Sequence, residues 1–136
     1  MEKEFVPYNL SLRMKQLGFD EPCVAHWFNN VGIGIEFRLE PLNEAIAKTN
    51  ISVYYELAPL YQQAFRWFRE KYSMYHQIHK GYGWEGIVRE SNNNESILWH
   101  DGTYNSPEEA ELACLEKLLS IVEEKQDALY KLIKEL

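Results

Sequence analysis

The last thirty residues carry the longest uninterrupted helical pattern in the chain. Ser106-Pro107-Glu108-Glu109 offers an N-cap serine, a proline at the first helical position and a glutamate that can reach back to the cap, which predicts a helix start. A helix over residues 107–136 would be about 45 Å long, whereas a compact domain of 136 residues is only about 36 Å wide. The helix must therefore either bend or extend beyond the domain.

The two halves of this predicted helix differ. In the first half, apolar residues cover more than half of the circumference, which is typical of a core helix: Ala110, Leu112, Cys114, Leu115, Leu118, Leu119, Ile121 and Val122. Beyond Lys125-Gln126-Asp127 the stripe narrows to Ala128, Leu129, Leu132, Ile133 and Leu136. A seam with coiled-coil spacing runs through both halves and is interrupted only at Gln126.

Two alternatives follow for residues 126–136. Either the helix kinks near Gln126 and its last turns fold back, or the tail protrudes and pairs with a second copy or a partner. In the second case, the candidates for self-association are Leu129, Leu132, Ile133 and Leu136.

The remaining secondary structure gives the order α-ββ-(β)-α-βββ-α. Apolar spacing predicts helices over 7–17 and 59–72. Strands are expected at 23–28 and 33–40, which form a hairpin, and at 51–55, 74–79, 84–90 and 96–100. A turn is expected at Asn92-Asn93-Asn94. The sequence therefore predicts one α+β domain over residues 1–136, an antiparallel sheet packed by about three helices.

Charge and cysteine content exclude several classes of protein. The net charge of −7 opposes nucleic-acid or anionic-membrane binding by the protein as a whole. Cys23 and Cys114 are too few for a disulfide framework or a zinc site, so both are expected to be buried free thiols. No signal peptide or membrane-spanning run is visible, so we expect a cytoplasmic protein without a membrane partner.

Motifs for catalysis are weak. Residues 81–88 match the glycine-rich GxGxxG pattern, but strand-like residues follow and Glu85 would repel a phosphate, so we interpret the glycines as a turn or bulge between strands. His76 and His79 would point to opposite faces of a strand and would not share a metal. We therefore expect no catalytic residues, no metal and no cofactor, and the balance favours a protein that is not an enzyme.

The segment 60–89 combines basic and aromatic residues, with a local net charge of +3. This combination is typical of single-stranded nucleic-acid binders, in which cations contact phosphates and rings stack on bases. The candidate surface is Arg66, Trp67, Arg69, Lys71, Lys80, Tyr82 and Trp84. Helical spacing places Phe65, Phe68 and Tyr72 on a core face, so much of the aromatic content is expected to serve packing.

Three blocks of sequence carry a resemblance to a known family. They are Pro7 to Cys23 (PYNLSLRMKQLGFDEPC), Leu60 to Tyr72 (LYQQAFRWFREKY) and Glu108 to Leu118 (EEAELACLEKL). Together they resemble a family of small uncharacterised proteins from gut bacteria and their phages. The resemblance implies an accessory protein of a mobile element and implies no activity, cofactor or catalytic residue.

The function expected from the sequence is that of a non-enzymatic protein-interaction protein, acting through its C-terminal helix or a sheet face. One alternative is nucleic-acid binding through segment 60–89. The other is a small enzyme whose class the sequence does not identify.

Overall fold

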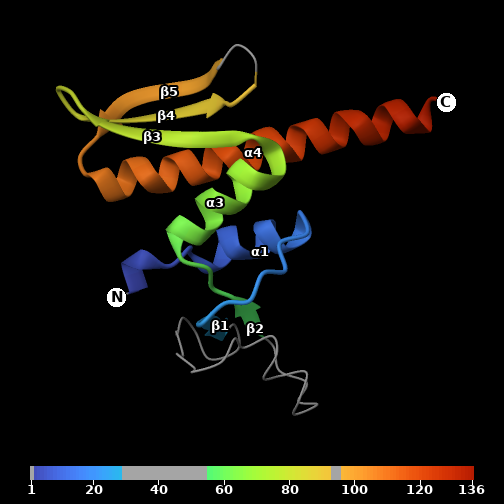
Figure 1. The fold of residues 1–136 in the computed structure, drawn as a ribbon, viewed down its shortest axis with the longest axis horizontal. Helices are drawn as coiled ribbons and strands as arrows, with labels where there is room; N and C mark the ends of the chain where they lie inside the picture. Colours follow the sequence, from blue (N-terminus) through green and yellow to red (C-terminus); the bar gives the residue numbers. More distant parts are fainter. Residues whose placement is uncertain (1, 29–54, 93–95) are drawn as a thin grey trace. The chain divides into compact units, whose positions relative to one another are not determined.

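The computed structural model describes residues 2–28, 55–92 and 96–136 (Figure 1). The chain forms two compact units, residues 1–64 and residues 65–136. The helix α3 (Tyr61–Tyr72) starts in the first unit and continues into the second.

The first unit contains the short 3-10 helix η1 (Glu2–Glu4), the helix α1 (Tyr8–Gln16) and the antiparallel strands β1 (His26–Phe28) and β2 (Tyr55–Leu57). Its small core joins the start of the chain to these strands through Phe5, Tyr8, Ala25, Trp27 and Ala58. The indole Nε1 of Trp27 donates a hydrogen bond of 2.8 Å to the carbonyl of Val6, so the buried ring has its polar atom satisfied.

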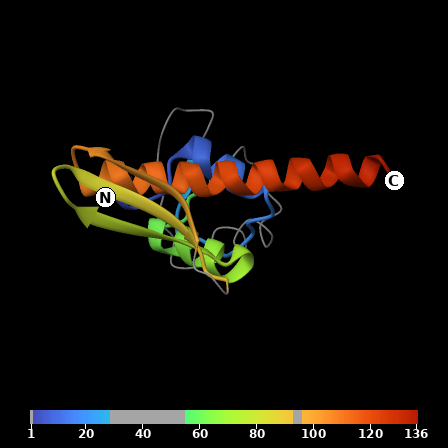
Figure 2. The same cartoon turned by 90° about the horizontal axis from the view of Figure 1, so that it is seen from above.

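The second unit is a three-stranded antiparallel sheet with a long helix on one face. The strands β3 (Met74–Lys80), β4 (Trp84–Glu90) and β5 (Ile97–Tyr104) lie in the order β3-β4-β5. The helix α4 (Pro107–Lys134) packs mainly against β4 and also contacts β3 and β5. Figure 2 shows α4 running past the sheet as one helix.

Gly86 allows α4 to approach β4 closely. A Cβ atom built at this glycine would lie 2.8 Å from the Sγ of Cys114, 3.2 Å from the ring of Trp99 and 3.3 Å from the carbonyl oxygen of Ala110. The pairing of β4 with β5 shifts between Trp84 and Gly86, which confirms the predicted bulge. Gly86 is therefore the point where helix and sheet backbone meet.

The start of α4 is capped as the sequence predicts. The Oγ of Ser106 accepts a hydrogen bond of 3.1 Å from the backbone N–H of Glu109. The Oε2 of Glu109 accepts one of 3.0 Å from the N–H of Asn105, the residue before the cap. Ser106 thus satisfies one N–H group of the first turn, whereas Glu109 reaches past the cap residue to Asn105 instead of bonding the cap itself, as the sequence had predicted.

The α+β class, the antiparallel sheet and the long C-terminal helix are confirmed, and the predicted helices and strands agree with the described ones to within a few residues. Two differences are notable. The third strand of the sheet, expected at 96–100, continues to Tyr104, because Tyr104 still pairs with Trp84. The first strand begins at His26 instead of residue 23. The expected strand at 33–40 and most of the one at 51–55 lie outside the described residues, as does most of the expected Asn92–Asn94 turn. That the chain forms a single domain stays a prediction.

The junction between α3 and β3 has a left-handed residue. Ser73 has a φ of 56°, and its N–H donates to the carbonyl of Arg69 at 3.1 Å, which ends the helix. Its own carbonyl accepts a hydrogen bond of 2.6 Å from the N–H of Ser91. A serine in this conformation is strained where a glycine would not be.

We predict that Ser73→Gly raises the free energy of unfolding by up to about 1 kcal/mol, because glycine adopts this backbone conformation without a Cβ clash. Urea denaturation measures the change. Ser91→Gly is the matched control and is expected to give no gain, because Ser73 is the only residue other than glycine with a positive φ among the described ones. A gain of equal size in both variants would contradict the prediction.

We predict that Gly86→Ala lowers the free energy of unfolding by about 1–3 kcal/mol, because the added methyl group meets Cys114 and the backbone of α4. The control is Gly81→Ala in the β3–β4 turn. There the new Cβ meets only the flexible end of the Glu85 side chain, and a much smaller loss is expected. Equal losses would show that Gly86 is not a site of close packing.

Candidate interaction surface at the end of α4

The helix α4 changes its surroundings halfway along its length. Leu115, Leu118, Leu119 and Val122 are at most 1% exposed, whereas every residue from Glu124 onward is exposed. The helix continues without interruption through Gln126 to Lys134. In the part of the chain that the structure describes, the end of α4 is thus an exposed helix (Figure 1).

Five large apolar side chains are exposed at this end, and we call them the apolar tail: Leu129, Tyr130, Leu132, Ile133 and Leu136. The first four are 58–61% exposed and Leu136 is fully exposed. At 100° per residue, all five fall within about 160° of the helix circumference. The charged residues of the same turns, Asp127, Lys131, Lys134 and Glu135, occupy the opposite side.

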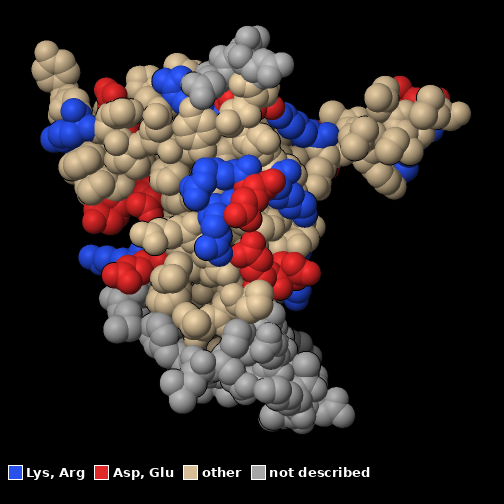
Figure 3. All heavy atoms as spheres, viewed as in Figure 1, with Lys and Arg blue, Asp and Glu red and all other residues tan. Residues whose placement is uncertain are grey.

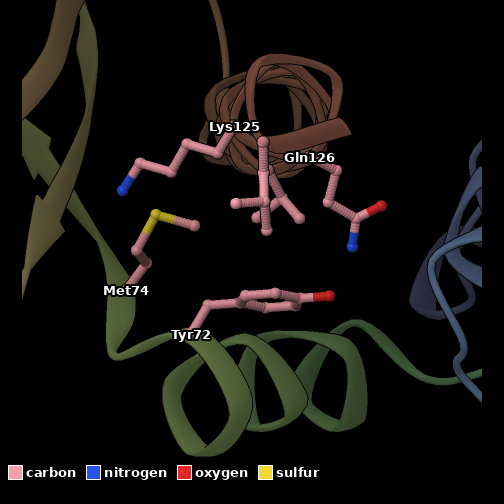
Figure 4. A pocket seen from close by; sticks show the side chains of 6 residues that line it. Tyr72, Met74, Lys125 and Gln126 are labelled. Carbon is pink, nitrogen blue, oxygen red and sulfur yellow. The ribbon is translucent and has the colours of Figure 1, made fainter. Parts of the chain in front are cut away.

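A groove begins where the apolar tail begins. It has a volume of about 140 Å³ and is lined by Tyr72 at the end of α3, Met74 at the start of β3, and Val122, Lys125, Gln126 and Leu129 of α4. Figure 4 shows the Tyr72 ring lying across the groove below α4, with Met74 beside it. Leu129 belongs to both groove and tail, so the two form one apolar surface.

Polar groups border this groove on two sides. The Nζ of Lys125 lies 3.6 Å from the Oε1 of Glu90 on β4, which holds the lysine over one wall. The Tyr72 hydroxyl is buried and has no hydrogen-bond partner among the described residues. It points to the same side as the Gln126 amide (Figure 4). The groove is therefore apolar at its centre and carries one unsatisfied hydroxyl at its edge.

The four residues that the sequence nominated for self-association all lie in the apolar tail. Tyr130 was missed because it flanks the seam with coiled-coil spacing instead of belonging to it. The groove was missed because Tyr72 and Met74 are about fifty residues from Gln126 in the sequence, and no local pattern links them.

The seven residues predicted to form a nucleic-acid-binding surface lie in two separate groups. Arg66, Trp67, Arg69 and Lys71 lie on α3, and Lys80, Tyr82 and Trp84 lie at the β3–β4 turn. The seven residues of β3 separate the groups by about 20 Å along the strand. In Figure 3, basic side chains over α3 have acidic side chains directly beside them. The structure does not bring the seven residues together as one basic surface.

The rings of these two groups also differ in exposure. Trp67 is only 6% exposed and packs edge-on against Phe68 and Tyr72, with the Nζ of Lys71 5.0 Å from its ring centre. Tyr82 is fully exposed, and the Nζ of Lys80 lies 5.5 Å from the ring of Trp84. The α3 group therefore presents cations without a free stacking ring, and much of the aromatic content of the segment is packing material.

His76 and His79 both lie on β3 and point to opposite faces of the sheet, as predicted for two strand residues three apart. His76 stacks on Phe65 with ring centres 3.5 Å apart, and its buried Nδ1 has no hydrogen-bond partner among the described residues. Burial, with a smaller contribution from the Arg69 charge, lowers the pKa of His76 to about 4. His79 is exposed. No group of three or more potential ligands in the described ranges is placed to hold a metal ion.

Both thiols are free and buried, which confirms the expectation from the cysteine count. Burial raises the pKa of Cys23 and of Cys114 to about 12. Both thiols therefore stay protonated and unreactive near neutral pH.

Comparison with known proteins gives no match: no protein-family model, no curated protein and no solved structure is similar to this chain. The resemblance to small proteins of gut bacteria and phages stays a prediction. Among the described residues, no helix is both long enough and apolar enough to cross a membrane.

The lowered pKa of His76 predicts that the free energy of unfolding depends on pH. Its pKa is about 4 in the fold against 6.5 for an unperturbed histidine, so the unfolded chain binds more protons between these values. The contribution of neutral His76 is complete above about pH 6.5 and is lost as the pH falls toward 4, amounting to about 3 kcal/mol. Urea denaturation at several pH values measures it.

The comparison variant is His76→Phe, which keeps the stacked ring on Phe65 and removes a nitrogen that has no partner. We expect this variant to lose less stability than the wild type between pH 6.5 and pH 4. If the free energy of unfolding of the two proteins changed in the same way with pH, the pH dependence would not come from His76.

Proposed function

We propose that this protein is a non-enzymatic interaction protein that binds its partner through the apolar tail of α4. The observation that carries the proposal is that five large apolar side chains are exposed together on one side of a continuous helix. Contiguous exposed apolar patches are uncommon on soluble monomers and mark interaction sites.

The energetics support this use of the tail. Burying a leucine or isoleucine side chain is worth about 1.5–3 kcal/mol relative to leaving it exposed. In the described structure four of these side chains are each more than half exposed, so most of the free energy of burying them is not realised within the single chain: Leu129, Leu132, Ile133 and Leu136. Removal of these side chains from water by a partner would therefore drive association.

The spacing of the tail matches a known mode of recognition. A helix that docks into an apolar groove uses anchors at positions i, i+3 or i+4, and i+7. Leu129, Leu132, Ile133 and Leu136 have this spacing. The charged residues on the other side of the helix keep the tail soluble until it binds.

An accessory role in a mobile element is part of the proposal and is supported by the sequence resemblance alone. The nucleic-acid alternative receives less support from the geometry, because its cations form two separate groups and Trp67 is buried.

We test the proposal by photo-crosslinking in cells that produce the full chain. A photoreactive residue replaces Ile133 in the apolar tail or, as the matched control, Lys131 on the opposite side. Because both positions are exposed, neither change is expected to alter the free energy of unfolding by more than about 0.5 kcal/mol. We expect discrete protein adducts from position 133 and few or none from position 131. Equal yields, or no adduct from position 133, would overturn the proposal.

A further inference from the structure

We infer that the partner of the apolar tail is a second copy of this chain, lying antiparallel along α4 so that each tail reaches the Tyr72–Met74 groove of the other copy. This inference rests on the proposed function and adds the identity of the partner and the geometry of the pair.

The burial pattern of α4 opposes a parallel pair. In parallel coiled coils the same seam positions of both helices meet, and stability grows with the number of heptads. Here the seam residues before Gln126, Leu115, Leu119 and Val122, are buried within the same chain. A parallel pair would therefore be limited to Leu129, Ile133 and Leu136 and would leave the groove empty.

An antiparallel pair uses the same residues and the groove as well. If the two-fold axis passes near residue 131, Leu129 of one copy faces Ile133 of the other, and Gln126 faces Leu136 of the other copy. Leu132 of one chain then contacts Leu132 of the second chain on one side of the seam. Tyr130 of one chain contacts Tyr130 of the second chain on the other side. The charged residues of the tail stay on the solvent side, and the one charged side chain that lines the groove, Lys125, lies 3.6 Å from the carboxylate of Glu90.

The volume of the groove fits this occupant. Its volume is about 140 Å³, close to the roughly 150 Å³ of an engineered apolar cavity that is large enough to bind benzene. One leucine side chain, Leu136 of the second copy, lies next to it in the antiparallel register. The groove is thus filled by a residue that is fully exposed in the single chain.

The size of the contact indicates the class of complex to expect. The apolar tail exposes on the order of 400 Å² of apolar surface in each copy. Together with the groove, a pair buries on the order of 1,000 Å² in total, at the lower limit of a specific interface. We therefore expect a reversible dimer, not an obligate one.

Gln126 has a defined role in this arrangement. It is the one polar residue of the seam, and it lies at the groove. Its amide lies on the same side as the Tyr72 hydroxyl, which has no partner among the described residues. Exclusion of water by the second copy favours a hydrogen bond between the two.

Cysteine crosslinking tests the orientation directly in the full chain. Gln126→Cys and Leu136→Cys are prepared as two separate proteins, since both positions are exposed and the variants should fold. In the antiparallel pair, like positions lie about 15 Å apart along the helix axis, so neither protein crosslinks alone. Mixed under mild oxidation, they form a disulfide-linked pair.

Three controls accompany the test. Wild type measures any background from the two buried native thiols. In a mixture of Asp127→Cys and Leu136→Cys, the thiol at position 127 lies on the solvent side of the helix. This mixture should form no disulfide. Ile133→Lys should weaken dimerisation at least tenfold in sedimentation equilibrium, whereas Lys131→Ala should leave it unchanged.

The outcomes are distinct. A disulfide only in the mixture, with a concentration-dependent mass, supports the antiparallel pair. Disulfides in each single variant alone, or a monomer throughout the range of about 1 μM to 1 mM, overturn it. If the chain is monomeric while position 133 still crosslinks to a different protein, the second copy is excluded and the proposed function stands. If position 133 gives no adduct either, both fail.

Discussion

The contact between α4 and β4 at Gly86 is the constraint on which the second unit depends. A three-stranded sheet has one face that must be covered, and this one is covered by the first half of a single helix. The absence of a side chain at Gly86 lets the helix approach until Cys114 and Ala110 touch the strand. The buried leucines of α4 then reach the sheet, and Val88 and Met74 become core residues. A larger residue at this position would meet Cys114, Trp99 and the backbone of Ala110, so helix and strand would have to move apart there.

The same helix is in two environments. Up to Val122 it is part of a hydrophobic core. From Glu124 onward every residue is exposed, although Lys125, Gln126 and Leu129 still border the groove with Met74 of β3. Short exposed helices are marginal in water by themselves. The tail is helical because it continues from a segment that is already nucleated, capped at Ser106 and packed. The core thus holds the apolar tail in a helical conformation before any partner arrives, which reduces the entropy lost on binding.

Local signals in the sequence were sufficient for much of the fold. The cap at Ser106, the apolar spacing of residues 59–72 and the strand patterns around 74–90 predicted elements that the structure contains. Non-local features were not predictable in the same way. Gly86 was expected only as a turn or bulge residue, because its contact with Cys114 joins elements that sequence spacing does not link. The groove needed Tyr72 and Gln126 to be neighbours in space. Trp67 was expected on a binding surface, although its ring is buried.

The length of the exposed helix has a geometrical consequence. In the antiparallel pair, Val122 of one copy and Val122 of the other are about 27 Å apart along the helix axis, given a rise of about 1.5 Å per residue. In the proposed pair the tails would therefore form a spacer that sets the distance between the two sheets. Each residue inserted between Val122 and the paired segment would be present in both copies, so it would lengthen that spacer and rotate each sheet about its own helix axis by about 100°. In such a pair, an insertion would change the distance and the relative orientation of the two copies together.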